Sequence, residues 1–144
     1  MMADKGAADA ALITFSLERA GDLGGDITPL VYERLFAEHP DMLDLFVRDT
    51  NGSVKGEMLM RVIEAILDFL GPRTYASTLI QCEVVTHESY GVPPEVFGVF
   101  FATVASTVKT VMGEEWTPTL DIAWTRLLAD LDHYVTHPDQ SVFA

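Results

Sequence analysis

The 144-residue chain is acidic: 22 Asp and Glu against 9 Lys and Arg give a net charge of −13, and 49% of the residues are hydrophobic. This length suits one domain, which we expect to span residues 1–144 with its core between about 7 and 136. The charge excludes a nucleic-acid backbone or an anionic membrane surface as partner. The apolar runs are shorter than the roughly 20 residues that cross a bilayer, and the lone Cys82 excludes an internal disulfide and a Cys-rich metal site. The N-terminus lacks the positive and apolar regions of a secretory signal, so we expect a cytoplasmic protein.

Helices are predicted throughout the N-terminal half, where apolar residues recur every three or four positions. Thr28-Pro29 is typical of a hydroxyl N-cap followed by proline at the first helical position. Ser53 is expected to cap a long helix that ends at Gly71-Pro72. The helices predicted in this half cover residues 7–19, 28–39, 40–46 (a short turn of helix) and 53–70, with a loop at 21–26.

The C-terminal half continues the same pattern. Residues 75–89 and 95–112 are predicted helices, and the β-branched content of the second does not make it a strand because 18 residues is too long for one. Thr117-Pro118 repeats the cap-plus-proline start and opens a last helix that runs to Val135. The fold class is therefore all-α, with six or seven helices.

Most catalytic motifs are absent. The glycines at 21–25 have the wrong spacing for a phosphate-binding loop, and there is no nucleophile elbow. His133 and His137 lie four residues apart, which is a metal-ligand spacing, but no acidic residue follows the metalloprotease pattern between them. We interpret them as an exposed pair.

Three stretches on three separate predicted helices form the informative constellation. They are Tyr32…His39-Pro40…Phe46, then Lys55-Gly56…Leu59, then His87-x-x-Tyr90-Gly91-Val92. In this order and spacing the chain resembles a globin, specifically the single-domain bacterial haemoglobins and the globin domain of flavohaemoglobins. The most specific pieces are LFAEHPDMLDLF and HESYGV, and the resemblance extends from about Leu12 to Val135. It implies a globin fold of six to seven helices around a haem pocket.

The resemblance implies a haem b site with His87 as the proximal iron ligand, and neutral imidazole is a good ligand for haem iron. Phe46 matches the aromatic residue that stacks on the haem. Val92 would pack on the ring edge, and Tyr90 belongs to the same cofactor pocket.

On the distal side the register places Lys55 at the gate and Leu59 over the iron. Gly56 then falls where the family keeps a small residue so that two helices can cross closely, and Met60, Ile63, Ile66 and Leu67 turn inward with Leu59. Shifting back by one residue would bury Lys55 at that crossing, and aligning without a gap would turn Glu64 inward. A Lys at the gate departs from the usual Gln or His. It has no acceptor, so it either extends to a haem propionate or contacts bound ligand.

Tyr32 falls where bacterial members carry a distal Tyr. Its hydroxyl would donate to bound dioxygen, which carries partial negative charge. The alternative is a buried Tyr whose hydroxyl is paired with the backbone.

Two further residues bear on the proximal side. Phe97 stands where flavohaemoglobins place a Tyr, so one member of a proximal hydrogen-bond chain is missing. Glu83 lies one helical turn before His87 and either accepts from the imidazole N–H or faces solvent.

The resemblance predicts a protein that binds O₂, NO and CO reversibly at a five-coordinate iron, since no His lies in or near residues 53–70 to add a distal ligand. It would serve oxygen binding and transport, or NO detoxification. The sequence ends at Ala144, so we expect no fused reductase, and NO dioxygenase turnover would require a separate one. The alternatives are a regulatory or sensor globin acting through partner contacts and a helical interaction module without cofactor. A monomer and a homodimer both remain open.

Overall fold

The computed structural model describes residues 2–46, 52–70 and 95–136. In these residues the elements are α1 (Met2–Gly24), α2 (Thr28–Glu38), η1 (Pro40–Phe46), α3 (Ser53–Leu70), α5 (Glu95–Met112), η2 (Gly113–Glu115) and α6 (Pro118–Thr136). The described part contains no strand, which confirms the all-α class. The predicted helix at 75–89 lies outside the described residues.

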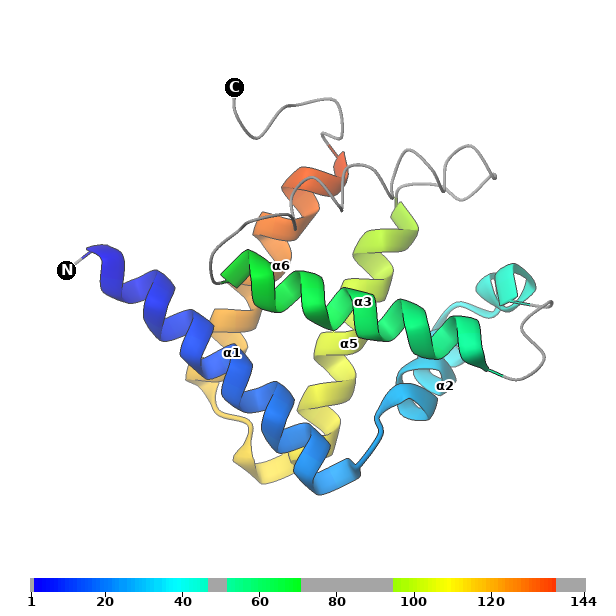
Figure 1. The fold of residues 1–144 in the computed structure, drawn as a ribbon, viewed down its shortest axis with the longest axis horizontal. Coiled ribbons are helices and arrows are strands. Elements are labelled where there is room, and N and C mark those ends of the chain that lie inside the picture. Colours follow the sequence, from blue (N-terminus) through cyan, green and yellow to red (C-terminus); the bar gives the residue numbers. More distant parts are fainter. Residues whose placement is uncertain (1, 47–51, 71–94, 137–144) are drawn as a thin grey trace.

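Helix α5 is the centre of the fold and packs against α1, α2 and α6. Figure 1 shows α5 and α6 running side by side. The apolar side chains that predicted a buried helix are indeed buried, among them Phe100, Phe101, Val104 and Val108. The hydroxyls of its buried threonines donate to carbonyls one turn back, Thr103 to Val99 at 2.7 Å and Thr107 to Thr103 at 2.8 Å. Polar groups inside this helix are thereby satisfied without partners from other helices.

The same helix corrects one expectation about membranes. Within the described ranges, residues Val96–Glu115 are long and apolar enough to cross a bilayer, with a mean hydropathy of 1.5. Length and composition therefore do not exclude a spanning segment. The packing of α5 among three other helices accounts for its apolar composition, because the core helix of a globular protein has the same composition.

Helices α1 and α6 are joined by a buried hydrogen-bond chain. The indole N–H of Trp124 donates to the Ser16 hydroxyl at 2.9 Å, and that hydroxyl donates to the carbonyl of Ile13 at 2.7 Å. All three residues are almost completely buried. On the surface the same seam carries the ion pairs Arg19–Glu115 and Arg126–Asp9, at 2.7 and 3.2 Å. Exposed pairs of this kind are screened by solvent and contribute little to stability, so the buried chain is the stronger link.

The two predicted cap-plus-proline starts have different outcomes. At α6 the Thr117 hydroxyl accepts from the backbone N–H of Leu120 at 3.1 Å, which confirms the cap. At α2 the cap prediction is wrong: Thr28 is already helical, and its N–H and hydroxyl both donate to the Asp26 carboxylate, at 3.0 and 2.6 Å. The turn before α2 is therefore closed by Asp26 in an Asx-type arrangement.

Helix α1 is longer than predicted and includes part of the expected loop at 21–26. It ends where Gly25 adopts a φ of +68°, a left-handed conformation that glycine takes without strain. Ala20, one turn earlier, is fully buried. Tertiary packing thus carries the helix past the point where its amphipathic pattern stops.

Candidate functional site

Tyr32 lies in the middle of α2 and is 3% exposed. Its ring packs against Phe36 one turn later, with centroids 5.9 Å apart, and against Phe100 of α5, with centroids 5.6 Å apart. The position of α2 follows from the Asp26 turn that starts it. The hydroxyl of Tyr32 is therefore held at a defined place between α2, α5 and α3.

That hydroxyl donates to the backbone carbonyl of Lys55 in the first turn of α3, with an O–O distance of 3.0 Å. This contact matches the interpretation in which the Tyr32 hydroxyl is paired with the backbone, rather than the one in which it donates to bound ligand. A phenol has one proton to donate. The predicted contact with bound ligand remains a prediction, and it requires the hydroxyl to leave Lys55.

Leu59 follows Lys55 by one turn of α3 and is 2% exposed. The predicted inward face of α3 is confirmed at Leu59 and Ile66, which are buried, and partly at Ile63, which packs against the core. It is wrong at Met60 and Leu67, which are 61% and 39% exposed. The buried stripe of α3 is thus narrower than predicted, and Met60 lies on its outer edge.

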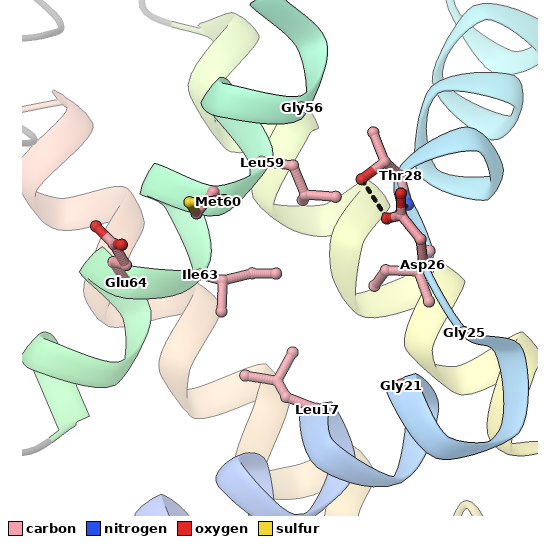
Figure 2. A pocket seen from close by; sticks show the side chains of 11 residues that line it. Leu17, Gly21, Gly25, Asp26, Thr28, Gly56, Leu59, Met60, Ile63 and Glu64 are labelled. Carbon is pink, nitrogen blue, oxygen red and sulfur yellow. Dashed lines mark hydrogen bonds between the residues drawn. The ribbon is translucent and has the colours of Figure 1, made fainter. Parts of the chain in front are cut away.

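Gly56 does not mark a close helix crossing. A side chain added at Gly56 would meet no heavy atom within 4 Å, so the expected contact of two backbones is absent there. Gly56 instead borders a pocket of about 520 Å³ between α1, the turn before α2 and α3. In Figure 2, Leu59 and Ile63 of α3 and Leu17 of α1 point into this space.

The rim of this pocket carries two carboxylates, Asp26 and Glu64. The hydroxyl and the backbone N–H of Thr28 donate to Asp26 and lower the pKa of its carboxyl below the usual 3.8. Of the predicted site residues that the structure describes, Leu59 is the one that lines the pocket. Leu59 therefore borders this pocket, whereas Tyr32 and Lys55 do not line it.

His87, Tyr90, Val92 and Glu83 lie outside the described residues, and Phe46 is the last residue of η1. Among residues 2–46, 52–70 and 95–136 there is no group of three or more His, Cys, Asp or Glu that could hold a metal ion.

Phe36 and Phe100 are the site residues that sequence reasoning missed. The four-residue spacing of Tyr32 and Phe36 on one helix was a usable signal, because such residues share a face. The contact of Tyr32 with Phe100 depends on the packing of α2 against α5, which has no local signature in the sequence.

The chemistry of the described site is simple: one phenol hydroxyl lies among apolar side chains. In the described ranges no buried side-chain nitrogen or oxygen lacks a hydrogen-bond partner. Phe36 and Phe100 supply apolar walls around the ring of Tyr32, and the Lys55 side chain is partly exposed. The Tyr32 hydroxyl can donate one hydrogen bond to a small acceptor.

The family model described as Globin matches residues 30–135, which is well over half of the sequence. No curated protein matches the chain.

Proposed function

Since the chain belongs to the globin family, which in general binds haem and diatomic gases, we propose that it holds haem b and binds O₂, NO and CO reversibly at a five-coordinate iron. The observation that carries this proposal is the buried hydroxyl of Tyr32, whose ring packs against the rings of Phe36 and Phe100. A buried hydroxyl donor favours ligands that gain negative charge when bound, because hydrogen bonds to charged groups are stronger than those to neutral groups. The proposed likeness to single-domain bacterial haemoglobins rests on the sequence motifs.

Each predicted site residue would have its own role in holding haem or its ligand. His87 would hold the iron, while Phe46, Tyr90 and Val92 would pack around the ring. When bound, haem would supply an iron that takes up a diatomic ligand. Tyr32 would donate to that ligand.

On the same side Leu59 would exclude water from the ligand. The ammonium of Lys55, on a long and flexible stem, would reach a propionate carboxylate or the ligand itself. These roles require only side chains from the first half of α3 and the middle of α2.

Oxygen transport and NO detoxification both use this chemistry, and the second needs electrons from a separate reductase. We propose one globin unit in the cytoplasm. A regulatory globin would share the haem and differ in its protein partners.

The test is haem binding by the purified protein and by two histidine variants. We expect a strong absorption band near about 400 nm, typical of haem, in the wild type. His87→Ala should abolish stable haem incorporation because it removes the iron ligand. His39→Ala is the matched control, since the structural role of His39 is a backbone N–H bond to the Leu35 carbonyl at 2.8 Å that this change keeps. Native haem content in His87→Ala would contradict the assignment of His87 as the iron ligand. A wild-type protein that shows no haem absorption band after incubation with haem would contradict the proposed function.

A further inference from the structure

We propose that the Tyr32 hydroxyl has two alternative acceptors and selects between ligands by exchanging them. Without a polar ligand, the Tyr32 hydroxyl donates to the Lys55 carbonyl and so holds the first turn of α3 in place. We call this hydrogen bond the clamp. When dioxygen binds, the hydroxyl turns to the ligand and releases that turn, whereas CO leaves the clamp closed. The ligand half of this inference rests on the proposed function, and the clamp itself does not.

The geometry of Tyr32 favours exchange over a large movement. The ring is held between Phe36 and Phe100, so the phenol oxygen keeps its place. Only the O–H bond must rotate for the donor to point elsewhere. The Lys55 carbonyl lies one helical turn before Leu59 and, in a regular helix, also accepts from the Leu59 N–H. This carbonyl thus keeps one hydrogen bond when Tyr32 leaves, which lowers the cost of the exchange.

The acceptors differ in charge. The Lys55 carbonyl is neutral, while bound dioxygen carries partial negative charge and bound CO is less polar. Hydrogen bonds to charged groups are about twice as strong as bonds between neutral groups. We therefore expect the Tyr32 hydroxyl to leave the Lys55 carbonyl for bound dioxygen but not for bound CO.

The first turn of α3 depends on this bond more than the rest of the helix does. It is flanked by Gly52, with a φ of +79°, and contains Gly56, whose N–H donates to the Gly52 carbonyl at 3.1 Å. No heavy atom lies within 4 Å of the position that a Cβ on residue 56 would take, and glycine is a poor helix former. Leu59 and Ile66 hold the later turns in the core. Loss of the Tyr32 bond should loosen residues 55–58 and leave the later turns protected.

The experiment is amide hydrogen exchange, resolved by residue, on the ferrous CO and ferrous O₂ forms and on the apoprotein. In the wild type we expect the amides of 55–58 to exchange two- to tenfold faster with O₂ than with CO, the range expected for loss of one neutral hydrogen bond. In Tyr32→Phe they should exchange at that faster rate in both liganded forms and in the apoprotein. Thr107→Val is the control. It removes a buried hydroxyl that donates to a carbonyl within α5, at 2.8 Å, and should leave α3 unchanged.

The possible outcomes distinguish the exchange of acceptors from the clamp at the Lys55 carbonyl. Equal exchange in the wild-type O₂ and CO forms would overturn the exchange of acceptors. Unchanged exchange in the Tyr32→Phe apoprotein would overturn the clamp. Failure of the wild type to take up haem would overturn the proposed function and the ligand half of this inference, while the apoprotein comparison would still decide the clamp.

Discussion

Replacing Tyr32 by Phe should speed dioxygen release by a moderate and calculable factor. The variant keeps the ring between Phe36 and Phe100 and removes the hydroxyl alone. A hydrogen bond to a charged group contributes about 1.5–3 kcal/mol, and a neutral one about 1 kcal/mol. Because the hydroxyl must first leave the Lys55 carbonyl, 3.0 Å away, the net stabilisation of bound dioxygen is the difference.

That difference is about 0.5–2 kcal/mol, and 1.4 kcal/mol is a factor of ten in rate. Tyr32→Phe should therefore release dioxygen roughly 2- to 30-fold faster than the wild type. The full bond to the ligand, with nothing lost at Lys55, would give roughly 10- to 100-fold. CO release should change little, since bound CO is the poorer acceptor.

The assay is rapid mixing of the O₂ form with excess CO, which reports the dioxygen off-rate, with the CO off-rate measured by displacement with NO. An unchanged dioxygen off-rate would show that the hydroxyl never leaves Lys55. A change above about 100-fold would show that the Lys55 bond costs nothing to break, which refutes the subtraction.

Three other predictions concern the fold around this site. Ser16→Ala should lower the free energy of unfolding by about 1–3 kcal/mol, because it leaves the buried indole N–H without an acceptor, whereas Thr125→Ala, at an exposed hydroxyl, should change it by less than about 0.5 kcal/mol in denaturant titrations. Leu59→Ala should cost about 2–5 kcal/mol and Met60→Ala less than about 0.5 kcal/mol, and the reverse order would contradict the register of α3. The folded-state pKa of Asp26 lies below its unfolded value, so its carboxylate stabilises the fold above about pH 3.8 and loses that contribution as the pH falls through the folded pKa. Asp26→Asn should thus be slightly less stable than the wild type at neutral pH, with a difference that disappears in acid; a constant difference from pH 7 to 2.5 would refute the role of the charge.

Helix boundaries were predictable where proline, glycine and apolar spacing coincide. The helices Ser53–Leu70 and Glu95–Met112 have the bounds expected from the sequence. Helix α1 exceeds its predicted range because its outer turns carry few apolar residues to reveal them, although Ala20 is buried. Periodicity detects the face that packs, and helical backbone beyond that face leaves no such pattern.

Individual contacts of the site were less predictable than its residues. Tyr32 and Leu59 could be named from the resemblance to bacterial globins, and both are buried. The acceptor of the Tyr32 hydroxyl could not be, because it is a backbone carbonyl on another helix. Met60 was placed inward because the sequence shows only which residues are apolar, while the side of α3 that packs is set by α1 and α2.

Because Tyr32 donates to the backbone of Lys55, the carbonyl and the side-chain ammonium of this residue can have separate roles. Its carbonyl orders the start of α3 through Tyr32, and any side chain at this position would supply the same carbonyl. Its ammonium carries no acceptor, whereas a Gln or His at this position would offer a competing acceptor to Tyr32. At the proposed gate position, a lysine therefore adds no side-chain acceptor to the two that we propose for the phenol proton, the Lys55 carbonyl and the ligand. Under this proposal, the departure from the usual gate residue lets the position of one proton report the charge of the ligand.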